Sequence, residues 1–225
     1  MDGPYLEFLA GNLFIWRNGW QAACTRIMQV KRIVSSRADR WRKPLVRTVR
    51  FVRLLRNCLT LVRLKSIGCS VDWSAIIHPS AVLERSGGTI VIGPRTHVDR
   101  GAIIRAMNGK IKIGADCNVN AYSFLSGAGG LDIGDSVMIG SHVSIYASNH
   151  IFTNMLVPMN KQGLDLKGIV IERDVWVGTG VRILDGVIVG TGSVVAAGAV
   201  ITKSTESYSI NAGVPARRIG SRIAT

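Results

Sequence analysis

The feature that most constrains this chain is a six-residue repeat of aliphatic side chains in its second half. From residue 171 to residue 201 a Val or Ile returns at every sixth position without an insertion. In each unit a small or β-branched residue follows four positions later. The repeated positions are Ile171, Val177, Ile183, Val189, Val195 and Ile201. A short fixed period indicates a repeat architecture, in which each unit buries its apolar side only by stacking on the next.

The same repeat continues upstream in groups of three units. Successive groups begin 18 to 21 residues apart, apart from one interval of 38 residues, and every insertion falls after the third unit of its group. The upstream groups are Val71, Ile77 and Leu83; Ile92, Val98 and Ile104; Ile113, Val119 and Leu125; and Ile133, Ile139 and Ile145. Eighteen residues in three equal legs predict one turn of a triangular coil with its aliphatic residues inside. Parallel strand pairing would join six such coils at a spacing of roughly 4.8 Å.

Composition excludes several other classes. Charged residues make up 19% of the chain and glycines number 25, which argues against a long coiled coil. The uncharged run 186–202 approaches the length of a membrane-spanning helix, but its glycines and β-branched residues follow the repeat, so we interpret it as buried strands. The cysteines show no C-x-x-C spacing, and such unpaired use is typical of a reducing compartment. They are Cys24, Cys58, Cys69 and Cys117.

The repeat and three short motifs resemble the left-handed β-helix acyltransferases, in the branch of maltose, galactoside and polysaccharide O-acetyltransferases. The motifs are Val-Trp-Val-Gly at 175–178, Gly-Ala-Val-Ile-Thr-Lys at 198–203 and Gly-Val-Pro-Ala-Arg at 213–217. The resemblance covers about residues 71–220. It implies a left-handed parallel β-helix over 71–206 with a loop at 146–170, and a coenzyme-binding turn and tail at 207–225. It also implies acetyl-CoA as co-substrate, a homotrimer, and no metal.

The long insertion carries the residue that we expect to be the general base. His150 stands where the repeat gives way to the loop, at the position that matches the family's catalytic histidine. An imidazole suits removal of a hydroxyl proton near neutral pH. The resemblance further implies that the backbone N–H of Thr179 binds the thioester carbonyl and the oxyanion formed from it. The loop holds many apolar residues, and the resemblance implies that it reaches a neighbouring subunit.

Further site residues follow from the same resemblance. Asn120 matches the asparagine that places the acceptor sugar, and Asn149 is assigned to the acceptor as well. Guanidinium groups suit the coenzyme's 3′-phosphate. The remaining histidines fall at different phases of the repeat, so we expect no ligand role for them. The residues expected to contact the coenzyme are Trp176, Thr179, Ala197, Thr202, Lys203, Pro215, Arg217 and Arg218.

Residues 1–70 form a basic front outside the resemblance, with 14 Lys and Arg residues against 3 acidic ones. Residues 45–65 show helical periodicity. We expect helices that cap the first coil, as solenoids require, and that also contact an anionic membrane surface. No motif or stacking platform indicates nucleic acid. The apolar face of the expected helix consists of Phe51, Val52, Leu55, Cys58, Leu59 and Val62.

The sequence therefore predicts an acetyl-CoA-dependent O-acetyltransferase that acts on a sugar or polysaccharide precursor by direct transfer at a trimer interface. We expect it in the cytoplasm, with peripheral contact at the inner face of the membrane. Two alternatives stay open. One is an N-acetyltransferase for an amino sugar or amino acid, or a serine O-acetyltransferase, because one histidine can serve an amine or a hydroxyl. The other is a non-enzymatic β-helical scaffold.

Overall fold

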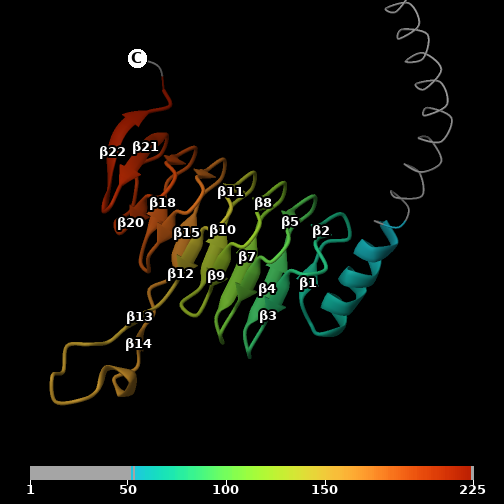
Figure 1. Ribbon diagram of the computed structural model, residues 1–225, viewed down its shortest axis with the longest axis horizontal. Helices are drawn as coiled ribbons and strands as arrows, with labels where there is room; N and C mark the ends of the chain where they lie inside the picture. Colours follow the sequence, from blue (N-terminus) through green and yellow to red (C-terminus); the bar gives the residue numbers. More distant parts are fainter. Residues whose placement is uncertain (1–51, 53, 224–225) are drawn as a thin grey trace, which may run out of the picture. The chain divides into compact units, whose positions relative to one another are not determined.

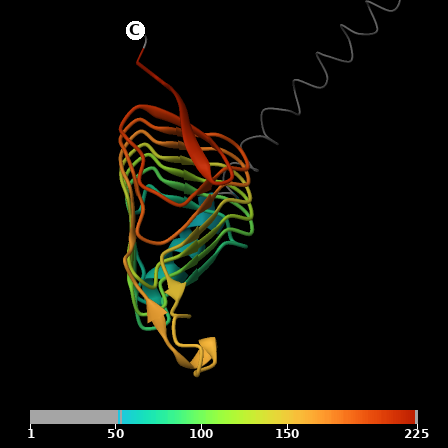
Figure 2. The same ribbon diagram turned by 90° about the vertical axis from the view of Figure 1, so that its left-hand side faces the viewer.

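Three parallel sheets form the faces of a triangular β-solenoid in the computed structural model, which describes residue 52 and residues 54–223 (Figure 1). The chain divides into two compact units, Met1–Leu54 and Leu55–Thr225, and the solenoid belongs to the second. Each coil contributes one short strand to each face, and the coils lie one upon another along the stack (Figure 2). The mainly β class and the six coils predicted from the repeat are thereby confirmed.

The strands of the three faces are short and evenly placed. Face 1 contains β1 (Ser70–Val71), β4 (Thr89–Ile92), β7 (Lys110–Ile113), β10 (Leu131–Ile133), β15 (Ile169–Ile171) and β18 (Ile188–Val189). Face 2 contains β2 (Ile76–Ile77), β5 (His97–Val98), β8 (Asn118–Val119), β11 (Met138–Ile139), β16 (Trp176–Val177) and β19 (Val194–Val195). Face 3 contains β3 (Val82–Glu84), β6 (Ile103–Arg105), β9 (Phe124–Ser126), β12 (Ser144–Tyr146), β17 (Arg182–Ile183) and β20 (Val200–Ile201).

The strand register reproduces the six-residue repeat. On face 1, Ile133 pairs with Ile113 in one direction and with Ile171 in the other, so the 20-residue insertion between these last two coils leaves the register unchanged. Every repeated aliphatic residue predicted to point inward is buried. Along each short strand the neighbouring residue points outward, as the period of two in a β-strand requires.

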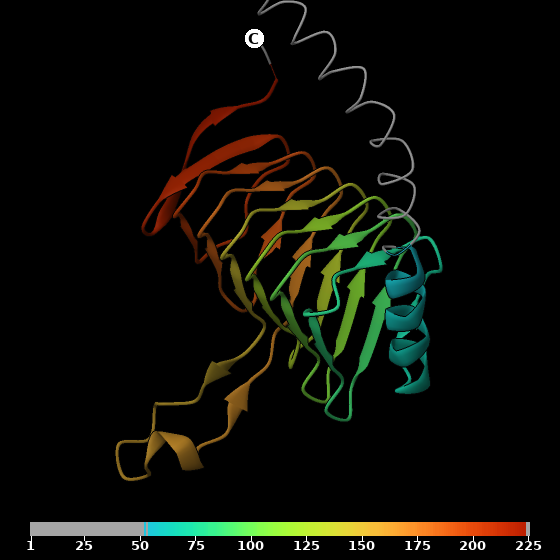
Figure 3. The same cartoon turned by 45° about the vertical axis from the view of Figure 1, so that its right-hand side comes forward.

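The long insertion leaves the solenoid between coils 4 and 5. It contains a small antiparallel pair, β13 (Asn149–His150) with β14 (Leu164–Asp165), and a single turn of 3-10 helix, η1 (Met159–Lys161). Figure 3 shows it projecting away from the stacked coils. Its base is held by Asp185, whose carboxylate accepts hydrogen bonds from the backbone N–H groups of Lys167 (2.9 Å) and Gly168 (2.8 Å).

A helix over residues 54–66 covers the open end of the first coil (Figure 3). Leu61 and Leu64 are buried there. The Asn57 side chain donates to the carbonyl of Ala75 and accepts from the N–H of Ile77, both at 3.0 Å. These bonds satisfy strand groups that no preceding coil can reach, which is what a solenoid cap must do.

The face of this helix that caps the coil is not the face singled out from the sequence. Leu55, Leu59 and Val62 are exposed, as are Val52 and Cys58; Phe51 lies outside the described residues. The apolar periodicity of this segment therefore predicted the helix, but the apolar face that it singled out is not the one that packs on the first coil. The described residues leave that face exposed. The rest of the basic front, residues 1–51, also lies outside the described residues.

At the other end the chain closes with a hairpin, β21 (Ser209–Gly213) and β22 (Ala216–Ser221), which extends face 2 beyond β19 (Figure 1). Within the described part of the chain, no helix is long and apolar enough to cross a membrane. Cys69 and Cys117 are buried free thiols, and Cys58 is an exposed one. Burial raises the pKa of the Cys69 and Cys117 thiols.

Candidate active site

The three long edges of the solenoid differ in how their backbone is used. We call the edge between faces 1 and 2 edge 1–2, the edge between faces 2 and 3 edge 2–3, and the edge between faces 3 and 1 edge 3–1. At edges 1–2 and 2–3 the chain turns through a four-residue corner, and the second residue of the corner presents its N–H outward or to the next coil. Whether that N–H is already bonded decides which edge can receive a ligand.

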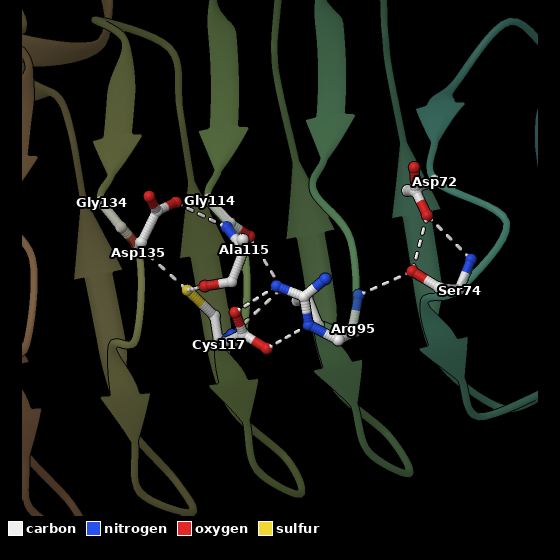
Figure 4. Close-up of polar contacts among 10 residues, drawn as sticks. Asp72, Ser74, Arg95, Gly114, Ala115, Cys117, Gly134 and Asp135 are labelled. Atoms are coloured by element: carbon white, nitrogen blue, oxygen red, sulfur yellow. Dashed lines mark hydrogen bonds and ion pairs between the residues drawn. The ribbon is translucent and has the colours of Figure 1, made fainter.

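Side-chain hydrogen bonds connect successive coils along edge 1–2 (Figure 4). The N–H of Ser74 donates to Asp72 at 2.8 Å, and the N–H of Arg95 donates to the Ser74 hydroxyl at 2.9 Å. One coil further, the N–H of Ala115 donates to Asp135 at 2.7 Å. Arg95 also forms a two-pronged ion pair with Asp116, with both N–O distances 2.6 Å. This edge is thus a structural ladder: among its second corner residues, the N–H groups of Ala115 and Thr191 are bonded by carboxylates, and Pro94 has no N–H.

The carboxylates of this ladder are held in their charged form. The hydrogen bond from the Arg95 guanidinium lowers the pKa of Asp116, and the hydrogen bond from the Ser74 hydroxyl lowers the pKa of Asp72. In coil 5, the hydroxyl and the N–H of Thr191 both donate to Glu172, at 2.6 and 2.7 Å, and lower its pKa. Hydrogen bonds to an ionised carboxylate favour that form.

Edge 2–3 is different because its last four corner N–H groups donate to no described residue. They belong to Ala121, Ser141, Thr179 and Ala197, one in each coil from the third to the sixth. The corner carbonyls still connect the coils: Thr179 accepts from Gly198 at 2.8 Å. The edge therefore presents a column of available hydrogen-bond donors spaced by one coil, roughly 4.8 Å.

Two of the residues expected to contact the coenzyme lie in that column. Thr179 and Ala197 are exposed and occupy equivalent positions in coils 5 and 6. The two backbones approach closely because the residue before Thr179 is glycine: a Cβ on Gly178 would come within 2.7 Å of the Ala197 nitrogen. Trp176 lies beside this corner in β16, half-exposed on the outer side of face 2. Asn120 begins the corner of coil 3 on the same edge.

The expected base is not on this edge within a single chain. His150 and Asn149 form β13, which leaves the solenoid at edge 3–1, and both are exposed. Face 3 separates this edge from Thr179. The structure therefore does not bring His150 and Thr179 together in one chain, and a site that uses both requires a second copy of the chain.

The C-terminal residues of the expected coenzyme site line a common hollow of about 300 Å³. It lies between the last coil and the hairpin, and Lys203, Arg217 and Arg218 all contribute to it. Arg218 is ion-paired with Glu206, whereas the Arg217 guanidinium donates to the carbonyl of Ala216. Thr202 and Pro215 are exposed nearby in sequence, outside the lining of this hollow.

Sequence reasoning missed two features of this surface. Tyr122 and His142 lie on edge 2–3 with their rings stacked, the centroids 5.5 Å apart and the planes at 16°. The repeat phase of His142 predicted no role, and only the fold shows that it follows Asn120 and Tyr122 along one edge. A second hollow, of about 480 Å³, lies at the base of the loop against face 1 and is lined by Lys110, Lys112 and Lys167 among others. No signal in the sequence linked these lysines.

No cluster of three His, Cys, Asp or Glu side chains suited to a metal ion occurs among the residues that the structure describes. His78 hydrogen-bonds the hydroxyl of Ser80 at 2.8 Å in the corner of the first coil. His97 lies in β5 on face 2, in register with Ile76 and Asn118.

Comparison with known proteins agrees with the fold and its repeat. The family model described as bacterial transferase hexapeptide (six repeats) matches residues 168–203. The dTDP-4-amino-4,6-dideoxy-D-glucose acyltransferase of Escherichia coli is 30% identical over 138 residues, which cover 59% of this chain and 72% of the relative. The putative lipopolysaccharide biosynthesis O-acetyl transferase WbbJ of E. coli K12 is 30% identical over 75% of this chain and 87% of its own length.

Solved structures give the same result. AntD, an N-acyltransferase from Bacillus cereus, was crystallised as a variant with dTDP-4-amino-4,6-dideoxyglucose and coenzyme A; it superposes with a TM-score of 0.65 at 27% identity, covering 73% of this chain and 90% of AntD. A coiled stack with this repeat and these relatives defines an acyltransferase. The chain belongs to the hexapeptide-repeat acyltransferase family.

Proposed function

We propose that the protein transfers an acetyl group from acetyl-CoA to a hydroxyl of a sugar or polysaccharide precursor, in a site shared by two subunits of a homotrimer. The column of available N–H groups on edge 2–3 carries this proposal. A thioester arm can lie along it and place its carbonyl oxygen on the N–H of Thr179. Such a donor stabilises the oxyanion that develops on attack, and loss of one donor costs about 10²–10³ in rate.

The projecting loop supports the contribution of a second subunit. Its apolar side chains are not covered by the residues that the structure describes; Met155 is 97% exposed and Leu156 is 94% exposed. Large apolar groups gathered in this way indicate a protein contact. Packing of the loop on a neighbour would carry His150 across to that neighbour's edge 2–3. There the imidazole would take the proton from the acceptor hydroxyl as its oxygen attacks the thioester carbon, and the coenzyme would leave as thiol.

The remaining assignments belong to the same proposal. Lys203, Arg217 and Arg218 would face the phosphates of the coenzyme from the hollow beside the hairpin, with Thr202 and Pro215 adjacent. Trp176 would wall the acetyl pocket, and Asn120 and Asn149 would hold the acceptor. Each assignment is supported by the position of the residue on edge 2–3, in the hairpin or in the loop. Each can be tested by substituting the residue and measuring the binding of the coenzyme or the acceptor.

The test is release of free thiol from acetyl-CoA in the presence of a panel of neutral glycans. We expect His150→Ala to lower kcat by about 10²–10⁴, whereas His97→Ala, an exposed histidine on face 2, leaves it unchanged. Equal activity of His150→Ala and the wild-type protein would overturn the assignment of the base.

One second candidate has a specific observation in its favour. The similar E. coli acyltransferase and AntD are named for dTDP-4-amino-4,6-dideoxy sugars, so the acceptor group here can be an amine on a nucleotide sugar. The panel therefore includes dTDP-linked amino sugars. Comparing the rates of acetylation of amino sugars and of neutral glycans distinguishes N- from O-acetylation. The scaffold alternative is contradicted by turnover with either class of acceptor.

We also propose that the helix over residues 54–66 contacts an anionic membrane surface. Leu55, Leu59 and Val62 form an apolar strip that residues 54–223 leave exposed, and Arg56 and Arg63 on the same helix are exposed. A basic amphipathic helix of this kind lies in the interface plane of a bilayer. The surplus of basic residues over the first 70 positions favours anionic lipid, at about 1 kcal/mol for each basic residue near the surface. The proposal places the enzyme in the cytoplasm at the inner face of the membrane.

A further inference from the structure

Two stacked rings lie in the middle of edge 2–3. Tyr122 in coil 3 and His142 in coil 4 occupy the third position of their corners, with φ of 59° and 57°. The equivalent positions in the neighbouring coils are all glycine. These glycines are Gly101 in coil 2, Gly180 in coil 5 and Gly198 in coil 6, and each has a positive φ.

The space around these glycines shows where the edge is filled and where it is open. A Cβ on Gly101 would meet the Tyr122 ring at 2.5 Å, so that ring lies over coil 2. A Cβ on Gly180 would find only the nitrogen of Gly198, at 4.0 Å, and a Cβ on Gly198 would find nothing within 4 Å. The space over Gly180 and Gly198 is therefore open, and two described side chains border it on the coil-4 side: the Arg182 guanidinium, which donates to the carbonyls of Gly180 (2.6 Å) and His142 (3.3 Å), and the ring of His142.

We infer that the Tyr122–His142 stack forms the end wall of the acyl pocket and restricts the donor to an acetyl group. The inference rests on the proposed function: with the coenzyme bound near the hairpin and its carbonyl on the Thr179 N–H, the acyl chain points toward coil 4. An acetyl methyl fits within the step of one coil, roughly 4.8 Å. A longer chain runs into the imidazole ring of His142, which Tyr122 holds from behind.

The fold alone does not set the acyl length. AntD, with a TM-score of 0.64 and 26% identity, was crystallised with dTDP and 3-hydroxybutyryl-CoA. A four-carbon acyl group is thus present in a structure of closely similar architecture. With acetyl-CoA as the proposed donor here, the difference in donor size would lie in side chains, and the stacked pair lies on the coil-4 side of Thr179, where the extra carbons would go.

The test replaces each ring with the residue that the neighbouring coils already use. His142→Gly and Tyr122→Gly remove the rings without backbone strain, because glycine adopts positive φ freely. Tyr208→Gly is a matched control. Tyr208 has a φ of 59° and its ring meets a Cβ on Gly192 at the same 2.5 Å, but on edge 1–2. All three variants lose one exposed ring from the same backbone conformation.

The measurement is the dissociation constant of coenzyme A, acetyl-CoA and butyryl-CoA by calorimetry, which needs no acceptor. We expect wild type and Tyr208→Gly to bind acetyl-CoA more tightly than butyryl-CoA. In His142→Gly the ratio of butyryl-CoA to acetyl-CoA affinity should rise at least tenfold, because a pocket that excludes or admits methylene groups discriminates by about that factor. Tyr122→Gly should raise it less, since its ring acts from behind.

The outcomes separate the inference from the function on which it rests. A ratio that stays unchanged in both ring variants, or a wild-type protein that binds butyryl-CoA as tightly as acetyl-CoA, overturns the inference and leaves the proposed function standing. A wild-type protein that binds none of the three coenzymes overturns the proposed function. A lowered melting temperature in all three variants with no change in ratio assigns the stack to packing alone, and this also overturns the inference.

Discussion

The carbonyl of Thr179 accepts a hydrogen bond from Gly198 at 2.8 Å, while the N–H of Thr179 donates to no residue that the structure describes. One peptide group thus connects two coils through its oxygen, and its neighbour keeps a donor for a ligand. On edge 1–2 the equivalent N–H groups of Ala115 and Thr191 donate to the carboxylates of Asp135 and Glu172. This contrast supports the proposal that the coenzyme lies along edge 2–3, whereas the side chains of edge 1–2 stabilise the stack.

A bulky side chain on edge 2–3 should block the coenzyme. Ala197 is exposed and outside the core, so Ala197→Trp should fold normally yet weaken coenzyme A binding at least tenfold by occupying the space beside Gly198. Calorimetric titration measures this. Arg173→Trp, at the second corner position of edge 1–2, is the control and should bind as the wild type does. Equal weakening in both variants would refute the choice of edge.

Adjacent isoleucines on β2 should lose very different amounts of stability on the same substitution. Ile77 is 1% exposed and Ile76 is 48% exposed. Ile77→Ala should lower the free energy of unfolding by about 2–5 kcal/mol, because it leaves a cavity in the core. Ile76→Ala should lower it by much less. Urea unfolding followed by circular dichroism checks both, and a larger loss at Ile76 would contradict the inward register.

Acid should destabilise the fold partly through edge 1–2. Hydrogen bonds from Thr191 lower the pKa of Glu172 below its ordinary value of 4.5. A depressed carboxyl pKa contributes stability that is present above the unfolded-state pKa and is lost as the pH falls through the folded-state value. Glu172→Gln should therefore flatten the loss of melting temperature below about pH 4.5. An acid limb identical to that of the wild type would contradict this.

The exposed strip of the N-terminal helix should govern binding to vesicles. Leu59→Asp should reduce co-sedimentation of the full chain with phosphatidylcholine vesicles that contain phosphatidylglycerol, and neutral vesicles should bind the wild type weakly. Val214→Asp is the control, since Val214 and Leu59 are both 71% exposed. Equal binding to neutral and anionic vesicles, or an unchanged Leu59→Asp, would show that the strip is covered by protein instead.

Most of the fold could be predicted because the repeat encodes it residue by residue. The pairing of Ile133 with both Ile113 and Ile171 follows from the six-residue repeat, although a 20-residue insertion separates the coils of Ile133 and Ile171. The hand of the coil does not follow from the period and came from the resemblance. The helix cap was harder, because Leu61 and Leu64 make the contact while the more regular apolar strip points outward.

The candidate site was only partly accessible from the sequence. Thr179, Ala197 and the Arg217 turn follow from motifs whose phase is fixed by the repeat. The Tyr122–His142 stack could not be found in this way, since two residues 20 positions apart meet only when the two-residue insertion between their coils is placed correctly. The separation of His150 from Thr179 within one chain is likewise a property of which edge the loop leaves.

The shared site is tested most directly by mixing two inactive variants. His150→Ala lacks the base and Ala197→Trp lacks the coenzyme edge, so each homotrimer alone should be inactive in thiol release. If the two groups come from different subunits, randomly reassembled trimers regain intact sites, roughly one quarter of the total. If mixing restores no activity, while wild-type protein taken through the same reassembly stays active, the shared acyltransferase site is contradicted.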